Sequence, residues 1–138
     1  MNIVYSYFVL DIVHRGHLLM LKNSKAIAGP DGRLIVGIVS DEAVLVKKGK
    51  APTLDFSERL ELANSIQYVD AVVGQQNYTP YENVTNIAPN ILMESESHDE
   101  AQINEGRRLM KELGGRVIVM PYFHDQSSTL IKSKISVV

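Results

Sequence analysis

Two histidines, His14 and His17, stand three residues apart around Gly16 in the segment DIVHRGHLLML. The segment follows an apolar run, Ile3 to Val9, and precedes a helix-like apolar pattern, so the histidines are predicted at a strand-to-helix turn. The first N–H groups of a helix lack partners and the helix dipole is positive there, which attracts anions. Gly16 lets a phosphate approach the main chain, and imidazoles donate hydrogen bonds to its oxygens. The pattern favours phosphate binding over ordinary cap histidines.

The composition of the chain narrows the chemistry that this corner can perform. The chain has 138 residues, is 45% hydrophobic, and has a formal net charge of −2 and no cysteine. This length predicts one domain and one site. Without cysteine there are no disulfides, thiolate metal sites or cysteine nucleophile, and a metal-binding histidine pair ranks below phosphate binding. Lys and Arg form no basic stripe, so we expect a small anionic ligand and no nucleic acid.

The N-terminal segment MNIVYSYFVLD is apolar but short. It carries no basic region or cleavage site of a signal peptide, and its apolar run is too short to span a bilayer. We therefore expect a cytoplasmic protein without a membrane partner.

Short β-branched runs alternate with amphipathic stretches along the whole chain. The runs predict strands at Ile3 to Val9, Arg33 to Val39, Asp70 to Gly74, Asn90 to Glu94 and Arg116 to Met120. Helices are expected near His17 to Ala28, Ser57 to Gln67, Tyr81 to Ile87, Glu100 to Leu113 and Ser128 to Ile135, with N-caps at Ser57 and Ser127. This alternation predicts a single α/β domain over residues 1–138, a Rossmann-like, doubly wound, five-stranded parallel sheet with helices on both faces. Such sheets bind ligands beyond the carboxyl ends of their strands.

Three segments together resemble one known family. DIVHRGHLLML resembles the signature of the small cytidylyltransferases and their nucleotidyltransferase superfamily, in which G-T-F-D-x-x-H-x-G-H joins the first strand to the first helix. Ser40 to Val73 resembles the middle segment of that family, and QSSTLIKS, Gln126 to Ser133, is similar to its I-S-T-T-K-I-K segment. The glycerol-3-phosphate cytidylyltransferases have the most similar pattern. The stretches ILMESESHD and VIVMPYFHDQSST resemble cytidylyltransferase domains that act on 2-hydroxyethylphosphonate.

The resemblance implies a reaction. CTP would bind at the edge of the sheet where the order of the strands reverses. CMP would be transferred from CTP to the phosphate or phosphonate group of a small alcohol, with release of pyrophosphate. Mg²⁺ held by the nucleotide phosphates would neutralise part of their charge. The resemblance also implies a homodimer and, for the phosphonate branch, fusion to a phosphoenolpyruvate mutase domain.

The resemblance also assigns roles to individual residues. Catalytic roles fall to His14, His17 and Lys47. Nucleotide contacts are expected from Phe8, Val9, Leu10, Asp11, Gly16, Ser127, Ser128 and Thr129. Acceptor contacts are expected from Lys48, Lys50, Arg59 and Tyr122. The three lysines, Lys47, Lys48 and Lys50, lie in a Gly-containing stretch that predicts a mobile loop. For Arg59 the alternative is an exposed ion pair with Asp55.

The chain departs from the family pattern at two places. Phe8-Val9-Leu10 replaces the Gly-Thr-Phe of the family, and the arginine before its serine-threonine segment is absent, with Tyr122 nearby. These departures keep open a nucleotide-binding sensor without catalysis. A second alternative, an adenylyltransferase of the flavin-nucleotide or pantetheine-phosphate type, stays open because the motifs shared across the superfamily do not decide the base.

The residues Glu94, Ser95, Glu96 and His98 lie at the end of the fourth predicted strand, on the ligand-binding edge of the sheet. These residues are expected to form a solvated acidic loop, with a helix cap at Ser97 or Asp99. A contact to the ribose or to magnesium-bound water is the alternative.

Overall fold

One parallel five-stranded sheet forms the centre of the computed structural model, which describes residues 1–122, 131 and 134–135. Its strands are β1 (Ile3–Phe8), β2 (Arg33–Val39), β3 (Ala71–Gln75), β4 (Ile91–Ser95) and β5 (Arg116–Met120). Their order across the sheet is β3-β2-β1-β4-β5. The predicted Rossmann-like α/β class is confirmed, and every predicted strand is present to within a residue at either end.

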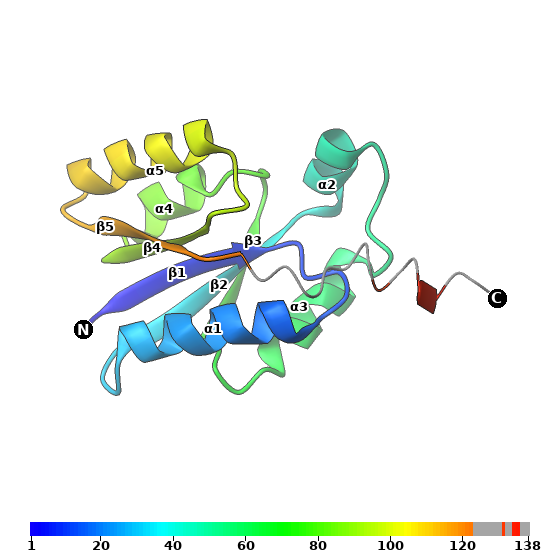
Figure 1. Ribbon diagram of the computed structural model, residues 1–138, viewed down its shortest axis with the longest axis horizontal. Coiled ribbons are helices and arrows are strands. Elements are labelled where there is room, and N and C mark those ends of the chain that lie inside the picture. Colours follow the sequence, from blue (N-terminus) through cyan, green and yellow to red (C-terminus); the bar gives the residue numbers. More distant parts are fainter. Residues whose placement is uncertain (123–130, 132–133, 136–138) are drawn as a thin grey trace.

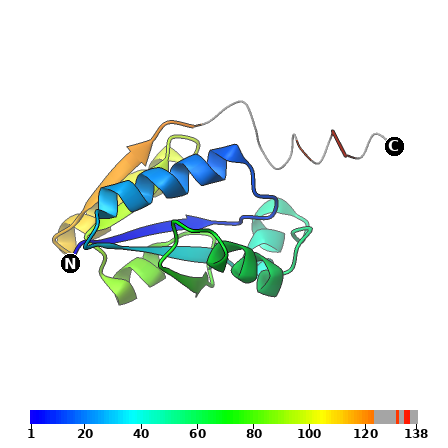
Figure 2. The same cartoon turned by 90° about the horizontal axis from the view of Figure 1, so that it is seen from below.

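Helices cover both faces of the sheet. They are α1 (Arg15–Ala28), α2 (Asp41–Lys48), α3 (Phe56–Asn64), α4 (Tyr81–Ile87) and α5 (Glu100–Glu112). Figure 1 shows α4 and α5 above the sheet and α1 below it. Seen from below, α1 and α3 both lie on the near side (Figure 2). Within the described part of the chain, no helix has the length and apolar character needed to cross a membrane.

The sheet divides the core into two apolar clusters. Alternate side chains of a strand point to opposite faces, so neighbours in β1 enter different clusters. Val4 packs with Leu21 of α1 and Ala63 of α3. Tyr7 belongs to the other cluster, with Val84 of α4. Residues on the two faces of β1 therefore meet different helices.

The strand order reverses at β1. The chain builds β2 and β3 on one side of β1 and then returns to add β4 and β5 on the other. β1 pairs with β2 from Ile3 to Phe8, but with β4 only at Val4–Ile91 and Tyr5–Leu92. The last residues of β1 and β4 thus lie beyond their paired region, and a crevice is expected at such a reversal.

The structure corrects the predicted lysine loop for Lys47 and Lys48, whereas Lys50 lies in the segment that follows α2. Lys47 and Lys48 form the last turn of α2, which begins after the N-cap Ser40 and ends at Gly49. The Ser40 side chain accepts a hydrogen bond from the backbone of Ala43, and Gly49 adopts φ 79°, a left-handed conformation that glycine tolerates best. Acidic residues in the first turn and lysines in the last turn complement the helix dipole.

The start of α3 also differs from the prediction. The N-cap is Asp55, whose carboxylate accepts a hydrogen bond from the backbone of Glu58, and Ser57 lies inside the helix. The N-cap of α5 is Asp99, one of the two residues, Ser97 or Asp99, at which the sequence predicted a helix cap. The N-cap predicted at Ser127 lies outside the described residues, as does most of the helix predicted at 128–135.

Candidate functional site

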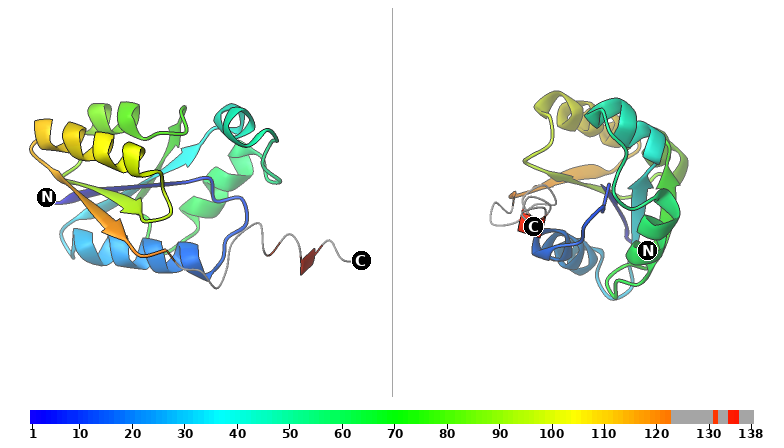
Figure 3. Two further views of the ribbon diagram at one scale, coloured as in Figure 1. Left: turned by 45° about the horizontal axis from the view of Figure 1, so that its top comes forward. Right: turned by 90° about the vertical axis from the view of Figure 1, so that its right-hand side faces the viewer.

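A cavity of about 910 Å³ lies at the carboxyl ends of β1, β4 and β5, beside the start of α1. Figure 3 shows these strand ends and the first turn of α1 on the same side of the molecule. The size suits a small-molecule ligand, and the position is the one at which sheets of this kind bind nucleotides. Its polar lining includes Asp11, His14, His17, Lys48, Lys50 and His98.

His14 and His17 cap the first turn of α1 and lie ring against ring. Nδ1 of His14 accepts a hydrogen bond from the backbone N–H of Gly16 at 3.0 Å, and Nδ1 of His17 accepts one from the backbone N–H of His14 at 3.3 Å. The two ring centroids are 3.9 Å apart. Because each Nδ1 accepts, a neutral ring must carry its proton on Nε2. Each ring can therefore donate one hydrogen bond to a ligand.

Burial keeps both imidazoles neutral near pH 7. The pKa of His17 is lowered to about 4, first by burial and second by the charge that His14 gains on protonation. Burial also lowers the pKa of His14. The first turn of α1, which is described throughout, contains no acidic residue to offset the positive end of the helix dipole. An anion at this turn would meet two N–H donors and an uncompensated dipole.

The low pKa of His17 predicts a pH dependence of stability. The unfolded chain binds a proton on this histidine as the pH falls through about 6.5, whereas the folded protein does so only near 4. The low pKa of His17 therefore adds up to about 3 kcal/mol to the free energy of unfolding. This stabilisation is fully present above pH 6.5 and is lost as the pH falls from 6.5 to about 4. We expect the urea midpoint of the wild type to fall more steeply across this pH range than that of His17→Gln. Parallel curves for the two proteins would contradict this prediction.

The loop after β1 packs against the histidine pair. The Phe8 ring meets the His17 ring edge-on, with centroids 5.8 Å apart and planes at 87°. Leu10 is only 1% exposed and has φ 58°, a conformation that is uncommon for a residue with a β-carbon. Phe8, Val9 and Leu10 line the cavity. Their predicted nucleotide contacts stay predictions, since the loop supplies backbone and apolar surface in place of a glycine and a hydroxyl.

Asp11 ties a second segment to this loop. Its carboxylate is 4% exposed and accepts hydrogen bonds from the backbone N–H groups of Thr53 and Leu54, at 2.9 and 2.7 Å. These bonds hold the segment that contains Lys50 against the end of β1. Asp11 therefore positions the wall of the cavity, and its predicted nucleotide contact stays a prediction.

The three lysines occupy different places. Lys48 and Lys50 line the cavity and are exposed, which suits a contact with an anionic ligand. Lys47, predicted to be catalytic, is not itself a lining residue, but its Nζ lies 5.7 Å from the centroid of the Tyr78 ring, which lines the same cavity, so its catalytic role stays a prediction. Lys48 and Lys50 therefore reach the cavity directly, and Lys47 lies beside it, over Tyr78.

Arg59 is a correction to the sequence prediction. Its side chain is fully buried and is absent from the cavity wall. It pairs with Asp41 at 2.6 Å, not with Asp55, and donates to the carbonyl oxygens of Val9, Val39 and Leu54. Val9 is the residue directly after β1, and Val39 is the last residue of β2. Arg59 therefore joins the carboxyl ends of two strands and does not bind an acceptor.

The remaining predicted contacts lie toward the C-terminus. Tyr122 lines the cavity and is 37% exposed, and its backbone N–H donates to the Glu96 carboxylate at 2.8 Å. Ser127, Ser128 and Thr129, predicted to bind the nucleotide, lie outside the described residues.

A buried polar network was missed by the sequence prediction. Glu94, expected in a solvated loop, is fully buried at the end of β4, where it accepts hydrogen bonds from the Tyr7 hydroxyl at 2.9 and 2.8 Å and contacts His98 Nδ1. Gln102 donates to the Tyr7 oxygen at 2.6 Å. Burial, followed by the Glu94 carboxylate, raises the pKa of Tyr7, so the hydroxyl stays protonated and donates. Two sequence signals pointed to this network: the spacing of Tyr5 and Tyr7 in the first strand, which places both rings on one face, and the polar stretch from Glu94 to His98 on the ligand-binding edge.

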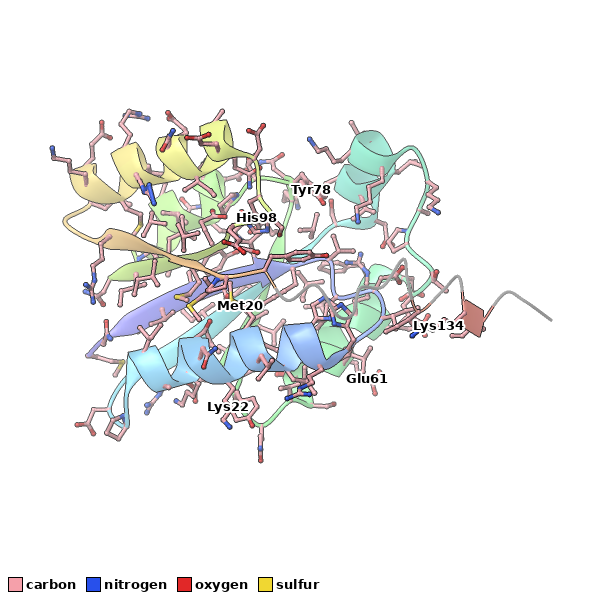
Figure 4. All side chains as sticks on the ribbon, in the orientation of Figure 1. Met20, Lys22, Glu61, Tyr78, His98 and Lys134 are labelled. Carbon is pink, nitrogen blue, oxygen red and sulfur yellow. The ribbon has the colours of Figure 1, made fainter. Side chains whose placement is uncertain are left out.

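This network borders the cavity from the face opposite α1. Tyr7 and His98 line the cavity, and the His98 ring stacks on the Tyr7 ring with centroids 5.3 Å apart. Figure 4 shows His98 on the α5 side of the sheet and Met20 of α1 on the other. The cavity thus has two polar walls, one built by the histidine pair and one by His98 and its partners.

Comparisons with known proteins agree with a nucleotide-type site. The model of the cytidylyltransferase-like family matches residues 9–134. An FAD synthase from Korarchaeum cryptofilum is 33% identical over 91% of this chain and 85% of its own length. The D-beta-D-heptose 1-phosphate adenylyltransferase of Bordetella bronchiseptica is 29% identical over 96% of this chain and 81% of its own length. Other relatives are longer: the chain spans 27% of the bifunctional protein HldE from Hydrogenovibrio crunogenus.

A solved structure supports the same relationship. The lipopolysaccharide core biosynthesis protein from Thermoplasma volcanium superposes with a TM-score of 0.70 at 28% identity, covering 89% of this chain and 97% of that protein.

Proposed function

The chain belongs to the cytidylyltransferase-like family of nucleotidyltransferases, and on this premise we propose that it transfers a nucleoside monophosphate from a nucleoside triphosphate to a phosphate-bearing small molecule, with release of pyrophosphate. The observation that carries the proposal is the pair His14 and His17 at the start of α1, on the wall of a cavity where the strand order reverses. Two neutral imidazole donors and an uncompensated helix dipole suit a polyphosphate.

In the proposed reaction, an oxygen of the acceptor phosphate attacks the α-phosphorus of the triphosphate in line. The bond from the α-phosphorus to the bridging oxygen breaks, and that oxygen leaves with pyrophosphate. Nε2–H groups of His14 and His17 donate to the departing oxygens, and Lys48 and Lys50 supply positive charge along the same cavity. Catalysis then consists of positioning and charge stabilisation, with no covalent enzyme intermediate.

Magnesium is proposed only as a partner of the nucleotide. Among residues 1–122, 131 and 134–135, no group of three or more His, Asp or Glu side chains could hold a metal ion. The Asp11 carboxylate already accepts two backbone amides. The described residues therefore supply no cluster of three such ligands, and no step above depends on a metal ion held by the protein alone.

ATP is the nucleotide that we favour, because a relative covering most of both chains is named a heptose 1-phosphate adenylyltransferase. That name also favours a sugar phosphate as the acceptor. The second candidate is CTP with 2-hydroxyethylphosphonate or glycerol 3-phosphate, which the description of the family and the sequence resemblance support. The homodimer and the fused phosphoenolpyruvate mutase domain stay predictions from that resemblance.

Pyrophosphate release distinguishes these candidates. The protein is incubated with Mg²⁺, one nucleoside triphosphate at a time, and a panel of sugar 1-phosphates, FMN, pantetheine phosphate, glycerol 3-phosphate and 2-hydroxyethylphosphonate. We expect acceptor-dependent release with ATP and a sugar phosphate. Pyrophosphate release with CTP and not with ATP would contradict ATP as the donor and support the cytidylyltransferase candidate. If the protein binds a nucleotide but no combination of nucleotide and acceptor releases pyrophosphate, the non-catalytic sensor is the remaining candidate.

A further inference from the structure

The cavity wall opposite α1 contains a histidine with one ring nitrogen directed away from its protein partners. The His98 ring is partly exposed, stacks on the Tyr7 ring and places Nδ1 against the buried Glu94 carboxylate. Every hydrogen bond of this ring to the described residues involves Nδ1. Within that part of the chain Nε2 has no partner, and His98 lines the cavity. A bound ligand can therefore meet Nε2.

The carboxylate fixes which nitrogen of the ring carries the proton. Glu94 is 0% exposed and accepts hydrogen bonds from the Tyr7 hydroxyl, and its contact with His98 Nδ1 needs a further donor. A neutral imidazole has one proton, and this contact holds it on Nδ1. The Ser95 amide, 3.4 Å from Nδ1, is too distant to compete. Nε2 then presents a lone pair, the reverse of the histidine pair at the start of α1.

A lone pair on a ring nitrogen suits a hydroxyl group. The oxygens of a phosphate monoester act mainly as acceptors at neutral pH, whereas a hydroxyl group also donates a hydrogen bond. A site built to bond a substrate hydroxyl rejects analogues that lack it, because its own polar group is then left unpaired. Nε2 of His98 can therefore recognise a hydroxylated part of a substrate.

The neighbouring wall suits the acceptor molecule. Lys48 and Tyr78 line the same cavity, and Figure 4 shows Tyr78 and His98 on the same side of the sheet, opposite Met20 of α1. Lys48 supplies positive charge for a phosphate group, and the Tyr78 ring supplies apolar surface for carbon atoms. In an in-line displacement the nucleophile approaches from the side opposite the leaving pyrophosphate, which the proposed reaction assigns to the histidine pair. The acceptor is therefore expected on the His98 side.

We propose that Nε2 of His98 accepts a hydrogen bond from a hydroxyl group of the acceptor, and that Glu94 is a positioning residue that holds the ring proton on Nδ1. This inference rests on the proposed function and deepens it, because it names the acceptor as the phosphate monoester of a polyol or sugar. Glu94 is too buried to touch the acceptor and acts through His98.

Nitrogen-15 NMR spectra of the four histidine rings test the proposal at about pH 8, where histidine is neutral. We expect the proton on Nδ1 in His98 and on Nε2 in His14 and His17. A non-hydrolysable ATP analogue, added first, should shift the His14 and His17 signals. Glycerol 3-phosphate or glucose 1-phosphate, added next, should shift His98 Nε2 saturably. The matched probes without hydroxyl groups, propyl phosphate and cyclohexyl phosphate, should leave it unchanged.

The outcomes separate this inference from the proposed function. If the ATP analogue leaves His14 and His17 unchanged, the proposed function fails. If it shifts them but neither hydroxylated probe shifts His98 Nε2, or the probes without hydroxyl groups shift it equally, only this inference is overturned. A shift of His98 Nε2 by the ATP analogue alone, absent with its dideoxyribose counterpart, would assign the lone pair to the ribose and overturn the acceptor contact.

Matched variants separate ligand binding from folding. His98→Asn places an amide N–H near the position of Nδ1, so it keeps a donor for Glu94 and removes Nε2. It should unfold at a temperature close to that of the wild type and lose a preference of about 10-fold for glycerol 3-phosphate over propyl phosphate, measured by calorimetry with the ATP analogue bound. Ser97→Ala alters the same loop, where the Ser97 hydroxyl pairs with Ser95, and should keep this preference. An undiminished preference in folded His98→Asn would overturn the proposal.

Glu94→Gln tests the positioning role. The oxygen of a glutamine can accept the Tyr7 hydroxyl while its amide donates to Nδ1, so the proton of the His98 ring should move to Nε2. This change is visible in the nitrogen signals of His98 without any ligand. A ring that keeps its proton on Nδ1 in folded Glu94→Gln would show that Glu94 does not set the position of the proton.

Discussion

Replacing His17 with glutamine is expected to reduce turnover of the nucleotidyl transfer by about 100- to 1,000-fold while the protein stays folded. In the structure His17 both caps α1 and offers an Nε2–H donor to the cavity. Glutamine at the third helical position keeps the capping role, since its side-chain oxygen accepts the same backbone N–H of His14. Only the ring donor to the leaving pyrophosphate is lost.

The companion variant is His14→Asn, because asparagine is among the best N-cap residues. Its side-chain oxygen replaces Nδ1 as the acceptor for Gly16. Both variants should keep the melting temperature of the wild type and lose kcat in the pyrophosphate-release assay. If both folded variants turn over at the rate of the wild type, the histidine pair has no part in the chemistry.

Arg59→Leu is expected to lower the free energy of unfolding by about 3 to 5 kcal/mol, measured by urea denaturation. The guanidinium is fully buried, and its removal leaves the carbonyl oxygens of Val9, Val39 and Leu54 without their donor. The lost hydrogen bonds destabilise the carboxyl ends of β1 and β2, which support the cavity. The KM for the acceptor should not change in the fraction that remains folded, because Arg59 does not reach the cavity.

Arg108→Leu is the matched control. Arg108 is 56% exposed on α5, where it pairs with Glu105 and Glu112. Such surface pairs contribute little, so this variant should unfold close to the wild-type midpoint. An Arg59→Leu protein that is as stable as this control, with a raised KM for the acceptor, would restore the ligand contact predicted from the sequence.

The helix α2 shows how a local signal can be present and still be overlooked. Ser40 as N-cap, acidic residues after it, lysines before Gly49 and the glycine itself are all features of a helix with both ends capped. The lysine and glycine content instead suggested a loop. The helix places Lys47 over the ring of Tyr78, a cavity-lining residue, and places Lys48 on the cavity wall, while Lys50 follows the helix and lines the same cavity.

The sequence by itself determined the alternation of strands and helices and the placing of His14 and His17 between β1 and α1. These features depend on periodicity, caps and turns, which act over a few neighbouring residues. Only the tertiary structure decided the partners of Arg59 and Glu94. Arg59 meets Val9, 50 residues away, and Glu94 meets Tyr7, 87 residues away. Such contacts depend on the order of strands in the sheet, because burial forces each charged group to take whichever partners that order brings within reach.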